Sequence, residues 1–113
     1  MEVRHQTSLA DARVAARRTM RVRKARDVRR RLDAVIAAVD ALDMPWGVWA
    51  DTVRQDVETR HGVAYPAPIE DADAIVLGDA EYGAALDCGT ALDQVKQALQ
   101  ATLASFNQAE QFR

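Results

Sequence analysis

The chain has 113 residues, of which 49% are hydrophobic and 28% are charged, a composition typical of one small folded domain rather than a disordered segment. No apolar run is long enough to span a bilayer, the N-terminus lacks the apolar stretch of a signal peptide, and the single cysteine excludes an intrachain disulfide. The net charge of −2 hides a division, because residues 1–31 carry 11 basic and 3 acidic groups while residues 32–113 carry 4 and 14. Because the sequence has no membrane span, signal peptide or disulfide pair, we expect an intracellular protein, in the cytoplasm or in a particle assembled there, with no membrane partner.

A long helix is predicted over residues 8–42, after an N-terminal tail of residues 1–7. Ser8 and Asp11 have the spacing of a capping box at its start, and neither Gly nor Pro occurs between residues 9 and 42. In the second half of this helix, apolar residues recur at steps of three and four, which places them on one face that packs against a core. They are Val28, Leu32, Val35, Ile36, Val39 and Leu42.

The first half of the same helix is strongly basic. Residues 13–31 hold ten of the 15 Lys and Arg residues and one acid, Asp27, which gives a local charge of +9. At about 100° per residue these cations point to all sides of the helix, and a helix that is polar on every side either meets a partner or bridges through solvent. The candidate binding residues are Arg13, Arg17, Arg18, Arg21, Arg23, Lys24, Arg26, Arg29, Arg30 and Arg31.

A second helix is predicted over residues 45–61, antiparallel to the first. Asp43 is the expected N-cap, Pro45 fits the first turn, and His61 with Gly62 forms the expected C-cap. The apolar face of this helix carries Trp46, Trp49, Val53 and Val57. We expect both tryptophans to lie in the core; the alternative is that one of them is an exposed aromatic anchor for a partner.

Residues 62–89 are predicted to form an acidic connector with short helical turns, because Pro66, Pro68, Gly78 and Gly83 disfavour a continuous helix. Residues 63–68 are expected to be extended, and a brief strand ended by Gly78 is the alternative to a short helix over residues 74–77. This connector carries a candidate acidic counter-surface for the basic helix, composed of Glu70, Asp71, Asp73, Asp79, Glu81 and Asp87. A last helix is predicted over residues 90–109, starting at a capping-box pattern at Thr90. The sequence thus predicts an all-α fold, a small helical bundle or hairpin, with residues 8–113 as one domain.

No pattern for catalysis, a metal or a cofactor is present, and we expect a non-enzymatic protein. Cys88 has no histidine near it in the sequence and lies one turn before Leu92, so we expect a small core residue and not a nucleophile. The acids between Asp71 and Glu81 do not have the spacing of a calcium loop, and apolar residues interrupt them.

Three hypotheses remain for the basic helix. It docks onto acidic protein surfaces, including those of a second copy, as part of an adaptor or of a larger bacterial or phage-like assembly. Alternatively, it binds nucleic acid through its phosphates, without sequence specificity. In the third hypothesis the acidic part of the same chain neutralises it. The protein-docking hypothesis leads, because the seven acids between residues 70 and 93 would compete with phosphate for the same arginines.

Overall fold

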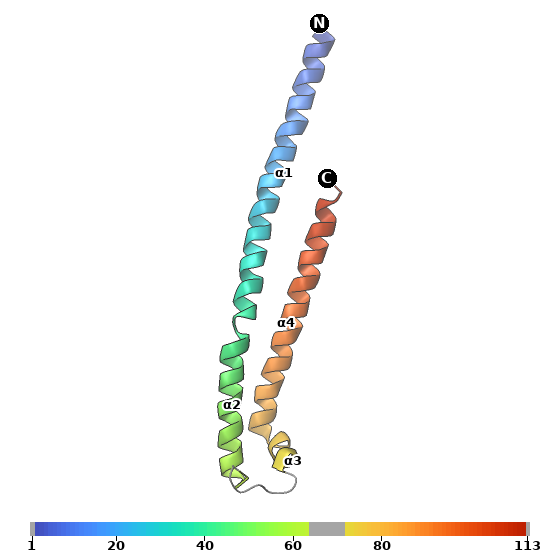
Figure 1. The fold of residues 1–113 in the computed structure, drawn as a ribbon. Coiled ribbons are helices and arrows are strands. Elements are labelled where there is room, and N and C mark those ends of the chain that lie inside the picture. Colours follow the sequence, from blue (N-terminus) through green and yellow to red (C-terminus); the bar gives the residue numbers. More distant parts are fainter. Residues whose placement is uncertain (1, 64–71, 113) are drawn as a thin grey trace. The chain divides into compact units, whose positions relative to one another are not determined.

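The chain folds into four helices, α1 (Glu2–Asp40), α2 (Asp43–Arg60), α3 (Ala72–Leu77) and α4 (Ala80–Glu110), shown in Figure 1. This computed structural model describes residues 2–63 and 72–112, and side chains from residue 8 onward. Within these ranges there is no β-strand, so the predicted all-α fold is confirmed. Residues 64–68 of the segment predicted to be extended (63–68), and the acids Glu70 and Asp71, lie outside the described residues.

Helix α1 begins at Glu2 and not at Ser8, so the predicted tail of residues 1–7 and the cap at Ser8 are wrong. The residues before Ser8 include neither Gly nor Pro, and nothing in them stops a helix that is already formed from extending toward the N-terminus. The helix runs without interruption through the whole basic stretch to Asp40.

The junction between α1 and α2 is a bend and not a reversal. Leu42 keeps right-handed helical backbone angles (φ −77°, ψ −15°) and its carbonyl accepts the first hydrogen bond of α2, from the N–H of Trp46 at 2.9 Å. Pro45 has no N–H to continue the α1 ladder, which explains a break at this point. Helix α2 therefore continues from the last turn of α1, and the predicted antiparallel arrangement of the two is wrong. Asp43 lies inside α2 and is not its N-cap.

The C-terminus of α2 follows the sequence prediction. Gly62 adopts a left-handed conformation (φ 70°), the N–H of Val63 donates to the carbonyl of Glu58 at 2.9 Å, and the N–H of Gly62 donates to Thr59 at 3.1 Å. This pair of hydrogen bonds is a Schellman motif, which ends a helix by satisfying its last carbonyls. The predicted C-cap at His61 and Gly62 is confirmed.

Helix α4 starts ten residues earlier than predicted, at Ala80 instead of Thr90. The Asp79 carboxylate caps it by accepting from the N–H groups of Glu81 at 2.9 Å and Tyr82 at 3.3 Å. The region predicted as a connector with short turns thus contains α3 and the first three turns of α4. Gly83 and Gly89 are both inside the helix.

The chain divides into two compact units. The basic unit comprises residues 1–36 and 99–113, and the acidic unit comprises residues 37–98. Both long helices run through the two units, so this division does not test the prediction of one helical domain over 8–113. Each unit is described separately below.

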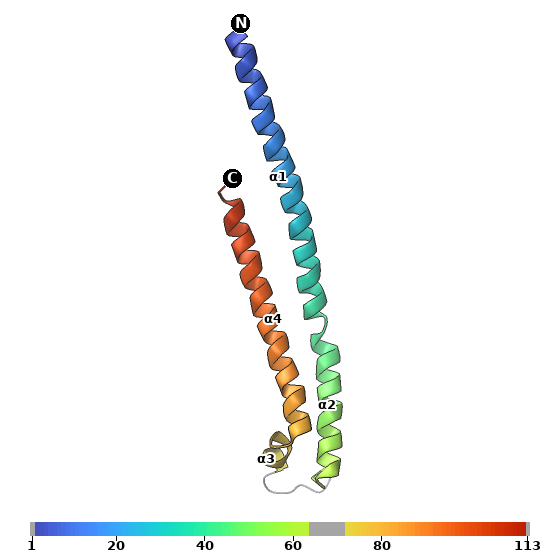
Figure 2. The ribbon, with the colours of Figure 1, turned by 180° about the vertical axis from the view of Figure 1, so that it is seen from behind.

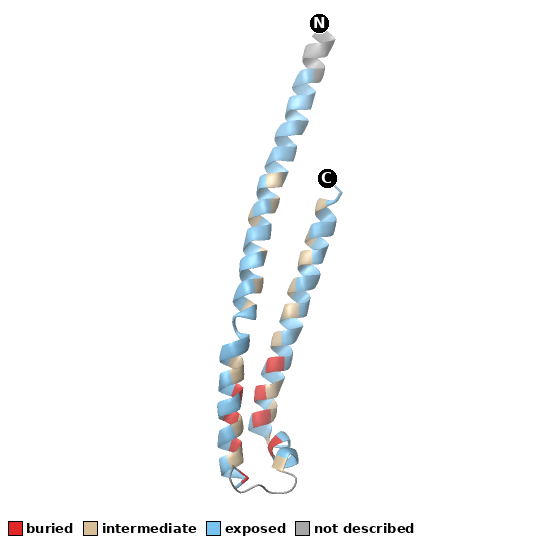
Figure 3. Cartoon of the chain, in the orientation of Figure 1, coloured by how far each residue is buried: buried red, intermediate tan, exposed pale blue. Residues whose placement is uncertain are grey.

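The acidic unit holds all the buried residues among those described (Figure 3). In both ribbon views α2 lies beside the first half of α4, and α3 lies at the bottom of the view, next to the start of α4 (Figure 1, Figure 2). The core side chains come from α2, α3, α4 and the α2 C-cap, and Val57 and Val76 are the most completely enclosed. The core consists of Val53, Val57, Val63, Val76, Tyr82 and Ala85.

The basic unit has no buried residue among its described side chains. Leu32 and Ile36 of α1 and Leu99, Leu103 and Phe106 of α4 are half-buried. Val28 and Val35, which were predicted to face the core, are 49% and 48% exposed. The two helices of this unit therefore cover only part of the apolar stripe that the sequence carries.

Candidate partner-binding surface

The two units differ in charge as well as in burial. The basic unit contains twelve basic and five acidic residues, a formal charge of +7, and the acidic unit contains three basic and twelve acidic residues, a formal charge of −9. This difference corresponds to the charge division seen in the sequence. Which charged side chains are already paired inside each unit decides which of them are free to bind a partner.

Three of the predicted counter-surface acids are paired within the acidic unit. Asp73 accepts from Arg54 at 3.0 Å, and Glu81 accepts from Arg60 at 2.9 Å. Asp79 is bound by Arg60 at 2.8 Å and by His61 at 2.9 Å. None of these three acids pairs with residues 13–31. These three acids thus help to hold their own unit together.

Asp79 is the most strongly perturbed of these acids. Its hydrogen bond with His61 holds the pKa of its carboxyl well below the usual range, and Arg60 and the capped amides of α4 add to this effect. Glu70 and Asp71 lie outside the described residues. Asp87 is exposed and makes no ion pair with any described residue.

Four of the ten basic residues have a partner inside the basic unit. Arg29 donates to Asp33 at 3.3 Å and to the side chain of Asn107 at 2.9 Å. Arg30 and Arg31 both bind Asp27, and these bonds lower the pKa of that carboxyl, Arg31 having the larger effect. The fourth residue, Arg21, donates to the carbonyl oxygen of Ala109 at 3.3 Å. Its Nε lies 3.7 Å from a carboxylate oxygen of Glu110.

The other six cations make no hydrogen bond or ion pair with any side chain or backbone group that the structure describes. They occupy a continuous part of α1 and are all exposed. These six are Arg13, Arg17, Arg18, Arg23, Lys24 and Arg26. Because cations without an internal partner keep their full capacity to bind carboxylates or phosphates, this part of α1 is the strongest candidate for contact with a partner.

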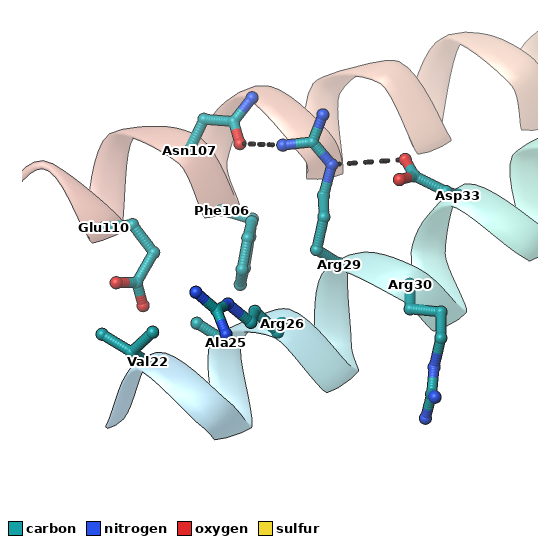
Figure 4. A pocket seen from close by; sticks show the side chains of 9 residues that line it. All are labelled: Val22, Ala25, Arg26, Arg29, Arg30, Asp33, Phe106, Asn107 and Glu110. Carbon is teal, nitrogen blue, oxygen red and sulfur yellow. Dashed lines mark hydrogen bonds and ion pairs between the residues drawn. The ribbon is translucent and has the colours of Figure 1, made fainter. Parts of the chain in front are cut away.

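Apolar side chains lie between these cations. A surface cavity of about 560 Å³ is lined by the apolar residues Val22, Ala25 and Phe106, by three arginines, by Asn107 and by the acids Asp33 and Glu110. Figure 4 shows Phe106 pointing from α4 toward α1 above Ala25, Arg29 held toward Asn107, and Arg30 directed away from α4. This cavity offers an apolar surface with guanidinium groups at its edge.

A second groove shares Ala25, Phe106 and Glu110 with the first and has a volume of about 400 Å³. We call it the basic groove. Met20 and Val28, which are 59% and 49% exposed, supply its apolar part. Three cations, Arg17, Arg21 and Lys24, line it as well.

The two tryptophans have different environments. The indole N–H of Trp46 donates to the carbonyl of Ala85 at 3.2 Å, and its ring lies against Gly89 of α4. Trp49 is 50% exposed. The prediction that both are core residues is therefore wrong. Trp46 is half-buried against α4 and does not belong to the enclosed core, and Trp49 has the exposure expected of an aromatic anchor.

Other candidate chemistry receives no support. Cys88 is exposed, so its prediction as a core residue is wrong. No cluster of three or more potential metal ligands occurs among the described residues. None of the described helices is both long enough and apolar enough to cross a membrane.

Phe106, Asn107 and Glu110 are surface residues that the sequence analysis did not assign to a site. Phe106 lies at helical spacing from Leu99 and Leu103, and its position next to Ala25 depends on the pairing of α1 with α4. Comparisons with protein-family models, with curated proteins and with solved structures find no match to this chain.

Proposed function

We propose that this chain is a non-catalytic helical adaptor or assembly protein whose basic unit docks onto an acidic protein surface. The protein would act as a subunit of a larger bacterial or phage-like assembly, in the cytoplasm or in a particle formed there. The observation that carries the proposal is the mixture of side chains on α1. Six cations without a described internal partner stand beside apolar residues that the chain leaves half-exposed.

The apolar residues favour a protein partner over a nucleic acid. Binding to a phosphate backbone is dominated by charge neutralisation and makes little use of exposed aliphatic side chains. Met20, Val28 and Phe106 in the basic groove instead suit a surface that brings apolar groups between its carboxylates. An amphipathic helix with an apolar stripe and acidic flanks has this chemistry.

The lack of a buried core in the basic unit also supports a partner. Two helices that pair through one half-buried stripe gain little from burial, and helices gain most of their stability from packing. A third helix placed over Met20 and Val28 would cover apolar surface that is now exposed, and its acids would offset the mutual repulsion of the cations.

Fluorescence anisotropy tests the proposal with three labelled probes. The first is an amphipathic helical peptide of Leu, Ala and Glu with all Leu on one face, the second is a scrambled peptide of the same composition, and the third is a DNA duplex. We expect the amphipathic peptide to bind at least about tenfold more tightly than the scrambled one, because only it presents a continuous apolar stripe. Binding should fall when Arg17 and Lys24 of the basic groove are changed to Gln, and also when Met20 and Val28 are changed to Gln.

Nucleic-acid binding is the alternative that the same assay detects. If the duplex binds more tightly than either peptide, with affinity falling about 10³-fold or more between about 50 and 200 mM salt, and the Met20 and Val28 changes have no effect, the docking proposal is wrong. A duplex that binds weakly, together with discrimination between the two peptides, supports it.

A further inference from the structure

A second exposed surface lies at the start of α2, in the acidic unit. Met44 and Val48 are 80% and 64% exposed, and Leu42 and Trp49 are about half-exposed. We call these four residues the α2 patch. Four large apolar side chains within eight residues, all open to solvent, are unusual on a small protein, because scattered single residues are the normal case.

The α2 patch places apolar side chains on a second side of the first half of α2. Trp46 and Ala50 face inward, while Met44 and Val48 point in outward directions of the same two turns. A surface helix normally has one apolar stripe facing its core, so a second exposed apolar side is a candidate contact surface. Gly47 adds to this picture: a side chain at this position would meet no atom within 4 Å, so no packing inside the chain requires a glycine there. Its lack of a side chain would let a partner helix approach closely.

The charges around the α2 patch are negative. Asp51 and Asp56 belong to α2 and make no ion pair with the described residues, and Asp56 follows Trp49 by seven positions, which puts the two on one stripe. All three cations of the acidic unit are already paired, Arg54 and Arg60 as described above and Lys96 with Asp43. The occupant of the patch should therefore combine apolar groups with positive charge.

The basic groove of the same protein has this combination. We propose that the α2 patch of one copy docks into the basic groove of a second copy, so that Val48 and Trp49 meet Met20, Val28 and Phe106 while Asp51 and Asp56 meet Arg17 and Lys24. This inference rests on the proposed function and names its acidic partner as another copy of the chain. It differs from the sequence-based expectation of a contact through residues 70–93, because Asp73, Asp79 and Glu81 are already bound within their unit.

Charge also decides between two kinds of self-association. A symmetric contact between two α2 patches would bring Asp51 and Asp56 close to their own copies, and a symmetric contact between two basic grooves would do the same with arginines. The head-to-tail contact joins opposite charges. Contacts of this type either close into rings or continue as open chains, which suits an assembly subunit.

Sedimentation velocity on the full chain tests this inference over a concentration series at about 50 and 200 mM salt. We expect the average sedimentation coefficient to rise with concentration and the association to weaken in the higher salt. If the α2 patch and the basic groove met only within one copy, the sedimentation coefficient would not change with protein concentration.

Two variants remove one side of the contact each. The patch variant carries Met44→Lys and Val48→Lys, and the groove variant carries Arg17→Glu and Lys24→Glu. The four side chains are exposed, so both variants should keep the helicity and thermal unfolding of the parent chain. The matched control carries Arg13→Glu and Arg23→Glu, which make the same charge change outside the basic groove.

We expect each variant alone to associate at least about tenfold more weakly than the parent, and an equimolar mixture of the two to form 1:1 complexes but nothing larger. The mixture should form complexes because the patch variant retains the basic groove and the groove variant retains the α2 patch. The control variant should associate like the parent. A parent chain that stays monomeric at high micromolar concentration, or a mixture that forms no complex, would overturn the inference. The proposed function would still stand if that monomeric chain bound the acidic amphipathic peptide and the groove variant did not.

Discussion

The two units of this chain use charged residues in opposite ways. In the acidic unit, Arg54, Arg60 and Lys96 each bind an acid from another part of the unit, and the unit has a small enclosed core. In the basic unit, the few ion pairs are mostly between neighbours on one helix, and six cations have no described partner. Charged residues in the acidic unit thus complete its fold, and we propose that those in the basic unit serve a partner.

The largest effect should come from removing buried volume in the acidic unit. Val57 is fully buried, and Val57→Ala removes two methyl groups and leaves a cavity, so we expect the free energy of unfolding to fall by about 2 kcal/mol. The same change at half-exposed Val28 in the basic unit should cost less than about 1 kcal/mol. Urea unfolding followed by circular dichroism measures both. Equal losses at the two positions would remove the distinction between the units.

The next effect concerns the contact of α4 with Trp46. A Cβ atom at Gly89 would lie only 2.8 Å from Cη2 of the Trp46 ring, so Gly89→Ala should destabilise the protein by about 1–3 kcal/mol. Gly83 in the same helix has nothing within 4 Å of that position, and Gly83→Ala should stabilise it by about 0.5–1 kcal/mol through helix propensity. Thermal unfolding of the two variants compares them, and opposite signs are expected. A stabilising Gly89→Ala would show that the Trp46 ring does not sit against α4.

Charge removal gives a smaller difference. Arg60→Gln breaks the bonds to Asp79 and Glu81 and should lower the melting temperature. Arg23→Gln removes a cation with no described partner, so it should change the free energy of unfolding by no more than about 0.5 kcal/mol. The change should be stabilising, because it reduces the repulsion between cations on α1. Differential scanning fluorimetry at low and high salt checks this pair. A larger loss for Arg23→Gln would mean that the basic helix is neutralised inside the chain.

The smallest effect is on acid stability. The pKa of Asp79 is lower in the folded than in the unfolded chain, so the stability it contributes is fully present above the unfolded value of about 3.9 and is lost as the pH falls through the folded value. We therefore expect the melting temperature of the parent chain to fall more steeply below about pH 4 than that of Asp79→Asn. Parallel curves of melting temperature against pH for the two proteins would contradict a stabilising role of the ionised Asp79 carboxylate.

Much of the fold follows from local sequence signals. The helical content, the Gly62 C-cap and the inward positions of Trp46, Val53 and Val57 were predictable, because they depend on propensity and spacing within one segment. The start of α4 was missed, although Asp79 followed by Tyr82 and Ala85 is a cap before an apolar face. Gly83 outweighed that signal in the prediction. Gly89 also lies inside α4, where its lack of a side chain makes room for the Trp46 ring.

The candidate site was only partly predictable. The basic residues are evident in the sequence, but the division into partnered and unpartnered cations depends on which side chains α4 brings near α1, as Asn107 and Arg29 illustrate. The acidic counter-surface was assigned from charge alone. Three of its described members, Asp73, Asp79 and Glu81, bind Arg54, Arg60 and His61, which are closer in the sequence and belong to the same unit.

Hydrogen exchange measured by mass spectrometry tests most directly the claim that a partner completes the basic unit. In the free protein, we expect amides of residues 13–31 and 99–110 to exchange faster than those of residues 50–60 and 80–89, because only the latter pack on an enclosed core. Addition of the acidic amphipathic peptide at saturation should slow exchange in the first pair of segments and leave the second pair unchanged. Equal protection of all four segments in the free protein, with no change on adding the peptide, would contradict the account.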